Sequence, residues 1–226
     1  MKLARPCRLL LCGATGRTGS RVAALARADR RFLLAGEISG VNAAAFGPAL
    51  KGAEVVVDFS TAAAVPGHAE AAARAGVASV IGVTGLSPRA LARLRALSKR
   101  AAILLSPNMS PGANFLIALA ARAAAALPGY DAGVFEIHHR LKKDRPSGTA
   151  LRLAAAAGKS VPIESLRLGD FVGEHTLTLA GPGESLSLSH RAVSRDVFAA
   201  GALRAALWIR GRRPGLYEMA DALGIR

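Results

Sequence analysis

Two histidines, two lysines and two arginines lie within residues 135–149, whose sequence is FEIHHRLKKDRPSGT. Histidine exchanges protons near neutral pH, and lysine and arginine side chains bind anions. Ser147, Gly148 and Thr149 then precede an alanine-rich run, which predicts a serine-capped helix over 150–157. A helix N-terminus attracts anions. Each feature alone is common in structural loops, but their coincidence predicts a site for a small carboxylated substrate beside a proton donor.

The residues that lead into this loop alternate in polarity, which predicts a short strand over 134–138. Val134, Glu136 and His138 would share one face of that strand, because side chains alternate between the two faces of a strand. His138 is therefore expected at the point where the strand opens into the basic loop.

A second motif, GATGRTG at residues 13–19, separates an apolar run at 8–12 from a helical stretch at 20–28. Glycine lets the backbone turn sharply and approach a pyrophosphate, which the following helix N-terminus stabilises. The next expected strand, at 32–38, carries Glu37, whose carboxylate can accept hydrogen bonds from an adenosine ribose. This order of elements predicts a dinucleotide-binding site.

The rest of the chain predicts two kinds of sheet. Buried strands are expected at 54–59, 77–81 and 102–105, with helices over 62–75 and 88–100. Their alternation predicts a parallel sheet with right-handed crossovers, which binds ligands at the carboxyl ends of its strands. After a helix over 114–127, period-two alternation predicts strands at 133–138, 174–180 and 184–190, with the last two forming a hairpin. A helix over 194–208 and a short C-terminal helix complete this α/β fold with an α+β insertion.

Composition excludes some functions. The 226 residues carry a formal net charge of +15, which makes nucleic acid a candidate partner. The basic residues are scattered, however, and aromatic residues make up only 4% of the chain, so we expect no nucleic-acid partner. Cys7 and Cys12 lie at odd spacing on one expected strand, and we expect no disulfide. We find no signal-like start or membrane-spanning apolar run, and expect a cytoplasmic protein that is not bound to a membrane.

Several segments together resemble the dihydrodipicolinate (4-hydroxy-tetrahydrodipicolinate) reductase family, in order over nearly the whole chain. They are EIHHRLKKDRPSGTA, GATGRTGSR, VVDFST, IGVTG, SPNMSPGAN, VGEHTLTLAGPGESLSLSHRAVSRDVFAAGAL and PGLYEM. The resemblance implies a Rossmann domain formed by 1–109 and 195–226, with a substrate-binding and tetramerisation domain of α+β type inserted at 110–194. It also implies a homotetramer that reduces 4-hydroxy-tetrahydrodipicolinate to tetrahydrodipicolinate with NADH or NADPH, in diaminopimelate and lysine biosynthesis.

The resemblance further implies roles for single residues. His138 would be the acid/base residue and Lys142 the proton donor, and His139, Ser147, Gly148 and Thr149 would contact the substrate. The cofactor would be lined by Gly13, Ala14, Thr15, Gly16, Arg17, Thr18, Glu37, Gly82, Val83, Thr84, Ser106, Pro107, Asn108 and Met109. Val83 and Met109 stand where the family usually has threonine and phenylalanine, so we expect altered cofactor affinity with activity retained. No metal site is expected, because the histidines lack the spacing of metal ligands.

Two other functions use a similar glycine turn. Short-chain dehydrogenases and epimerases require a Tyr-x-x-x-Lys pair, but Tyr130 and Tyr217 are followed four residues later by Val134 and Asp221. A cofactor-sensing regulator would lack the polar loop at 135–149, which is intact here. For the cofactor itself, Glu37 favours a free ribose, while Arg17 and the positive net charge attract a 2′-phosphate. We therefore expect use of both cofactors with a modest preference for NADH.

Overall fold

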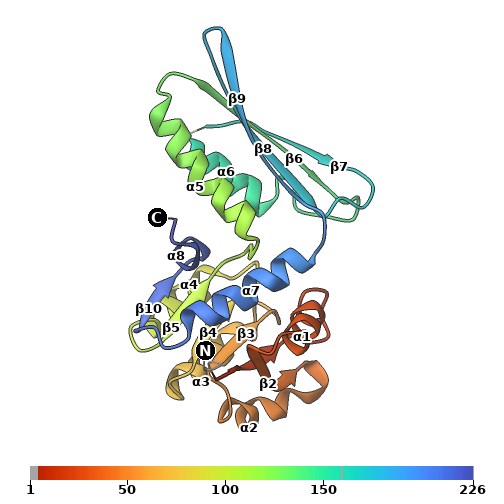
Figure 1. Ribbon diagram of the computed structural model, residues 1–226, viewed down its shortest axis with the longest axis vertical. Coiled ribbons are helices and arrows are strands. Elements are labelled where there is room, and N and C mark those ends of the chain that lie inside the picture. Colours follow the sequence, from red (N-terminus) through yellow and green to blue (C-terminus); the bar gives the residue numbers. More distant parts are fainter. Residues whose placement is uncertain (1–4, 159, 226) are drawn as a thin grey trace. The chain divides into compact units, whose positions relative to one another are not determined.

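The computed structural model describes residues 5–158 and 160–225. The chain separates into two compact units (Figure 1). The first unit contains the residues up to Met109 together with Phe198–Ala222, and the second contains Ser110–Val197 with the last residues from Leu223. Among the described residues, no helix is long and apolar enough to cross a membrane.

The first unit is built on a six-stranded parallel sheet of order β10-β5-β4-β3-β1-β2. Its strands are β1 (Cys7–Cys12), β2 (Phe32–Ile38), β3 (Val55–Asp58), β4 (Ala78–Ile81), β5 (Ala102–Leu105) and β10 (Gly215–Tyr217). Most of their residues are apolar and buried, as expected for parallel strands covered on both faces. The parallel sheet is confirmed, and the C-terminal segment completes it through β10. Because β2 and β3 flank β1 on opposite sides, the strand order reverses at β1, where open α/β sheets bind ligands.

Helices cover this sheet. They are α1 (Gly19–Ala28), α2 (Phe46–Leu50), α3 (Val65–Arg74), α4 (Pro88–Leu97), α7 (Asp196–Ile209) and α8 (Met219–Leu223), with a 3-10 helix, η1, at Gly40–Ala45. One apolar cluster joins α3 and α4 to β4 and β5, and another joins α2 and α3 to β1, β2 and β3. Cys7 and Cys12 are buried and unbridged in β1, and burial raises the pKa of the Cys7 thiol to about 11.

The second unit has a four-stranded mixed sheet of order β7-β6-β8-β9. Its strands are β6 (Asp131–His138), β7 (Ile163–Arg167), β8 (Gly173–Gly181) and β9 (Glu184–Ala192), and only β6 and β7 pair in parallel. Both α5 (Pro111–Ala126) and α6 (Gly148–Ala157) lie on one face of this sheet (Figure 1). Leu116 of α5, Leu153 of α6 and Leu177 of β8 belong to the core between them. The predicted hairpin is confirmed as β8 and β9.

The observed elements extend or shorten the predicted ones by a few residues, and four elements were not predicted. These are β7, β10, η1 and α2, which together account for the segments 40–50, 163–167 and 215–217. Each is short, and β10 has only three residues. A short segment gives too few periods of a hydrophobic pattern to be recognised from sequence.

Candidate active site

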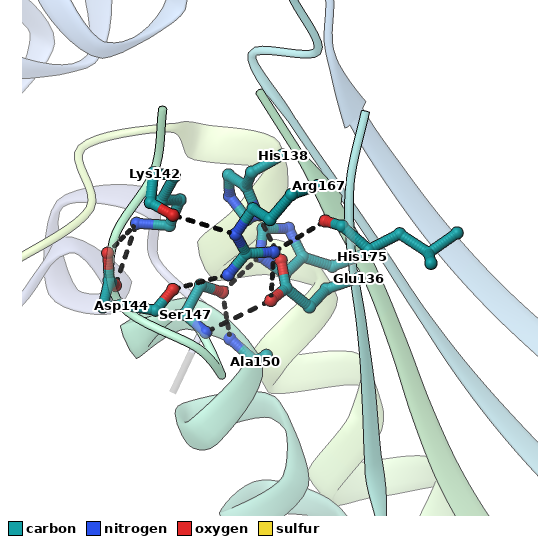
Figure 2. Close-up of polar contacts among 9 residues, drawn as sticks. Glu136, His138, Lys142, Asp144, Ser147, Ala150, Arg167 and His175 are labelled. Atoms are coloured by element: carbon teal, nitrogen blue, oxygen red, sulfur yellow. Dashed lines mark hydrogen bonds and ion pairs between the residues drawn. The ribbon is translucent and has the colours of Figure 1, made fainter. Parts of the chain in front are cut away.

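Strand β6 places Glu136 and His138 side by side on the face that the helices cover. Glu136 is fully buried and His138 is 8% exposed, while Phe135, the residue before Glu136, is 38% exposed on the other face. The Nδ1 atom of His138 contacts the Oε2 atom of Glu136 (Figure 2). The strand ends at His138, as the alternation predicted.

Arg167 connects this pair to the basic loop. It lies opposite His138 in the parallel pairing of β6 with β7, and its side chain is only 7% exposed. Its Nη1 atom donates to Oε1 of Glu136 at 2.9 Å. Its Nε atom donates to the carbonyl oxygen of Lys142 at 3.2 Å, and its Nη2 atom donates to the carbonyl oxygen of Asp144. Figure 2 shows the guanidinium between the carboxylate and the loop, so one side chain fixes both.

The charges of this cluster follow from its burial and its contacts. Burial would raise the pKa of the Glu136 carboxyl, but the Ser165 hydroxyl, the Arg167 guanidinium and the His138 ring together lower it below its ordinary value. Burial lowers the pKa of His138, and this effect outweighs the Glu136 carboxylate, which raises it. At neutral pH the pair is therefore a carboxylate beside a mainly neutral imidazole.

A second histidine closes the cluster from β8. His175 lies opposite Glu136 in the antiparallel pairing, and its ring meets that of His138 edge to face with centroids 5.0 Å apart. Its Nε2 atom lies 3.1 Å from the hydroxyl of Ser147. Burial first, and then the neighbouring His138, lowers the pKa of His175 to about 3. His175 is therefore a neutral neighbour at physiological pH.

The N-terminus of α6 has the predicted cap. Ser147 is buried, and its hydroxyl accepts a hydrogen bond from the backbone N–H of Ala150 at 3.2 Å. Gly148 is exposed in the first turn of this helix, where backbone N–H groups have no partner within the helix. Thr149 is half-buried in the same turn.

The basic loop holds Lys142 in an ion pair. Its Nζ atom lies 2.8 Å and 2.9 Å from the two carboxylate oxygens of Asp144. The Lys142 side chain is 23% exposed, and its charge contributes to lowering the pKa of His138. His139 is half-buried immediately after the end of β6. The structure therefore gathers His138, Ser147 and the Lys142 backbone around Glu136 and Arg167.

The glycine turn in the first unit has no room for a side chain at Gly13 or Gly19. Gly13 has φ +77°, and a Cβ atom there would lie 2.4 Å from the carbonyl oxygen of Phe59. A Cβ atom on Gly19 would lie 2.0 Å from the carbonyl oxygen of Gly13. Thr18, at the start of α1, makes no side-chain capping hydrogen bond. Within the turn, the backbone N–H groups of Gly16 and Ser20 donate to the carbonyl oxygens of Gly13 and Gly16, each at 3.0 Å. The positive end of the α1 dipole remains compatible with an anion such as a pyrophosphate.

The loops after β4 and β5 lie at the same carboxyl edge of the sheet. A Cβ atom on Gly82 would lie 2.3 Å from the Phe59 ring, and Ser106 donates its hydroxyl to the carbonyl oxygen of Asn108 at 2.7 Å. Val83 belongs to the apolar cluster between α3 and α4, and Met109 is 1% exposed. The two residues that depart from the family pattern are therefore packed in the protein interior.

Glu37 near the end of β2 has an ion pair that the sequence did not indicate. Its carboxylate contacts the guanidinium of Arg27, which lies on α1 and is 60% exposed. Its own carbonyl oxygen accepts a hydrogen bond from the Asn42 side chain at 2.8 Å. Arg27 precedes Glu37 by ten residues and lies on the helix before its strand.

In two groups of potential metal ligands, the carboxylate oxygens already accept hydrogen bonds. Glu136, His138 and His175 place ligand atoms within 4.8 Å of one another, but both Glu136 oxygens accept from His138 and Arg167. In the first unit, both oxygens of Asp58 are engaged, one by Ser60 and the other by His68. Neither arrangement indicates a bound metal.

Two family models match this chain, "Dihydrodipicolinate reductase, N-terminus" over residues 7–109 and "Dihydrodipicolinate reductase, C-terminus" over residues 112–223. The chain belongs to the dihydrodipicolinate reductase family. The resemblance predicted from its motifs is thereby confirmed.

Known members of this family align along nearly the whole chain. A 4-hydroxy-tetrahydrodipicolinate reductase of Anaeromyxobacter dehalogenans strain 2CP-1 is 38% identical over an alignment 265 residues long, gaps included, which covers 97% of this chain and 98% of the relative. One of Myxococcus xanthus is 46% identical over 198 residues, covering 77% and 73% of the two chains. The solved dipicolinate-bound dihydrodipicolinate reductase of Paenisporosarcina sp. TG-14 has a TM-score of 0.83 at 20% identity, and the alignment covers 96% of this chain and 98% of the other. This structural likeness confirms the fold.

Three members of the cluster were not assigned a role from the sequence. Glu136 stands two residues before His138, a spacing that places both on one strand face, and this signal was present in the sequence. Arg167 and His175 reach the cluster from β7 and β8, whose register with β6 depends on tertiary pairing. Only the structure therefore shows how Arg167 and His175 support the Glu136–His138 pair.

Proposed function

We propose that this chain reduces 4-hydroxy-tetrahydrodipicolinate to tetrahydrodipicolinate, with the cluster around His138 as the site of proton transfer. As a member of its family, the chain is an NAD(P)H-dependent oxidoreductase of diaminopimelate and lysine biosynthesis. The observation that carries the assignment of the site is the buried Glu136–His138 pair, which lies beside the capped start of α6 and the Lys142 loop.

In this proposal the second unit binds the substrate. The backbone N–H groups of Gly148 and Thr149 would hold one substrate carboxylate at the N-terminus of α6. His139 and Ser147 would complete the contacts, and the Lys142 ammonium would attract the second carboxylate. An anion near His138 raises the pKa of its imidazole, so substrate binding itself favours the protonated form.

The first unit would bind the cofactor along the carboxyl edge of its sheet. The residues that we assign to it are those of the glycine turn at 13–18, Glu37, and the loops at 82–84 and 106–109. Bound NADH or NADPH supplies the hydride that reduces the substrate. The reduced ring then carries an enamine that must gain a proton, which His138 donates while Lys142 holds charge nearby.

The uncovered face of the second sheet supports assembly into a homotetramer. Phe135 is 38% exposed and Leu166 is 47% exposed on that face. Beside them, the hydroxyls of Thr176 and Ser189 lie 2.8 Å apart across β8 and β9. A second copy would cover this mixed apolar and hydroxyl surface, and Phe135→Glu should reduce the mass measured by sedimentation.

We place this biosynthetic enzyme in the cytoplasm.

The deciding experiment is a coupled assay with purified protein. Dihydrodipicolinate synthase generates the substrate from aspartate semialdehyde and pyruvate, and oxidation of NADH or NADPH is followed with time. Omitting the synthase is the control. No turnover with either cofactor would refute the reaction. His138→Gln should lower turnover by a factor of ~10²–10⁴ with cofactor binding intact, because general acid catalysis contributes a rate enhancement of that size. If that variant kept more than half of wild-type turnover between pH 6 and 8, the proton would come from another group.

A further inference from the structure

The hydrogen bond between Glu136 and His138 determines which nitrogen of the imidazole is free to react. An ionised carboxylate only accepts hydrogen bonds, so the Nδ1 atom of His138 must donate to Glu136. Arg167 holds the other carboxylate oxygen at 2.9 Å, and the backbone N–H of Ser147 points to the same oxygen at 3.4 Å. The carboxylate therefore cannot turn away from His138 without losing both contacts.

The opposite nitrogen of the ring faces a residue without a side chain. A Cβ atom on Gly173, the first residue of β8, would lie 2.9 Å from Nε2 and 3.2 Å from Cδ2 of His138. Gly173 does not have a positive φ, so its backbone would accept alanine. The requirement for glycine at this position is therefore one of space beside Nε2.

We propose that Glu136 is a positioning residue that fixes the tautomer of His138, so that Nε2, in the space that Gly173 keeps open, is the atom that transfers the proton. The inference rests on the proposed function, which assigns the proton transfer to His138. In the step itself, the N–H bond at Nε2 breaks and a C–H bond forms on the enamine carbon of the reduced ring. His138 remains as a neutral imidazole with its proton on Nδ1, and solvent restores the proton on Nε2.

The first test reads the tautomer in the unligated protein. Nitrogen-15 NMR of histidine-labelled protein, with the His138 signals assigned through His138→Gln, should show the neutral ring protonated at Nδ1 and bare at Nε2. A ring protonated at Nε2 would overturn the proposal. This measurement needs neither substrate nor turnover, so it remains informative if the assigned reaction fails.

The second test removes the charge of Glu136 but keeps its shape. Glu136→Gln should lower turnover by roughly 10²–10⁴ and change the Michaelis constant for the substrate far less, as when the carboxylate partner of a catalytic histidine becomes an amide. Glu174→Gln is the matched control, since Glu174 stands next to Gly173 on β8 and pairs with Arg191. Turnover of Glu136→Gln within twofold of wild type would overturn the proposal.

The pH profile separates positioning from a merely structural role. The charged or titratable groups that act on His138 are Glu136 on its own strand, Lys142 in the loop, Arg167 on β7 and His175 on β8. Of these, Glu136 is the one that raises the pKa of His138. Turnover that needs protonated His138 falls as the pH rises through that pKa. In Glu136→Gln the fall should therefore occur at lower pH, and an unshifted profile would contradict the proposal.

The space beside Nε2 has its own pair of variants. Gly173→Ala should reduce turnover at least tenfold, because the new methyl group lies within contact distance of the reacting nitrogen. Gly133→Ala on β6 is the control, since a Cβ atom there meets nothing within 4 Å. Equal turnover in the two variants would overturn the role of Gly173.

Discussion

Replacing His175 with glutamine should make the free energy of unfolding of the second unit depend less on pH below neutrality. His175 is 3% exposed, and burial together with the neighbouring His138 lowers its pKa to about 3. A histidine in the unfolded chain has a pKa of roughly 6.5, so below that pH the unfolded chain binds a proton that the folded unit excludes. The contribution of neutral His175 to stability is therefore complete above pH 6.5 and is lost as the pH falls toward 3.

The magnitude follows from this difference in pKa. At pH 4, about 2.5 pH units below the unfolded value, the free energy of unfolding is lower by about 3 kcal/mol, at about 1.36 kcal/mol per pH unit. This is a large fraction of the roughly 5–15 kcal/mol that stabilises a typical domain. Partial relaxation of the folded structure around a charged His175 would reduce the loss.

Urea denaturation at intervals between pH 4 and 7 measures the effect. The free energy of unfolding of wild type should fall more steeply with acid than that of His175→Gln, whose amide can still contact the Ser147 hydroxyl. Carboxylates titrate in both proteins, so their effect cancels in the difference. His190→Gln is the control, because the pKa of His190 is also lowered by burial, but by less. Parallel curves for wild type and His175→Gln would refute the assignment of a neutral buried imidazole.

Three further predictions concern substrate, cofactor and turn. Lys142→Ala should raise the Michaelis constant for the substrate and lower turnover, since it removes a charge that the bound dicarboxylate needs, and steady-state kinetics would show both. Specificity constants should favour NADH modestly. Arg27→Ala should widen that preference, because it removes the cation paired with Glu37, whose carboxylate would then repel a 2′-phosphate more strongly. A preference for NADPH above about a hundredfold, roughly 2.7 kcal/mol, would contradict this. Gly19→Ala, whose Cβ atom would lie 2.0 Å from a carbonyl oxygen, should weaken cofactor binding in titrations. The control is Gly67→Ala on α3, whose Cβ atom would meet nothing within 4 Å and which should stabilise the protein by about 0.5–1 kcal/mol.

The parallel sheet and its glycine turn could be predicted because their signals are local. The apolar runs of β1 and β3 are continuous, and the glycines of 13–19 stand between a strand and a helix in sequence order. The contact between Gly13 and Phe59 was not predictable in the same way. It depends on the adjacency of β1 and β3, which the sequence separates by more than forty residues.

The cofactor side shows the same limit. The sequence indicates a carboxylate at Glu37 near a strand end, but its partner Arg27 lies on the preceding helix and points to it only after α1 packs beside β2. Val83 was assigned to the cofactor from its place in a loop motif. Its side chain packs in the apolar cluster of α3 and α4, and its role toward the cofactor stays a prediction. The direction of a side chain after a strand end depends on tertiary packing, which a motif does not specify.

In the second unit, the pairing of Glu136 with His138 could be predicted from the sequence, but the residue that holds Glu136 ionised could not. Glu136 and His138 share a face because they are two residues apart on a strand, and this follows from the sequence. Holding Glu136 ionised in the interior, however, requires a buried cation, because an uncompensated buried carboxylate is strongly unfavourable. That cation comes from β7, a five-residue strand whose pattern alone is too short to predict. Arg167 also holds the Lys142 loop through two carbonyl oxygens, so the parallel pairing of β6 with β7 sets the protonation state of the pair and the position of the loop together.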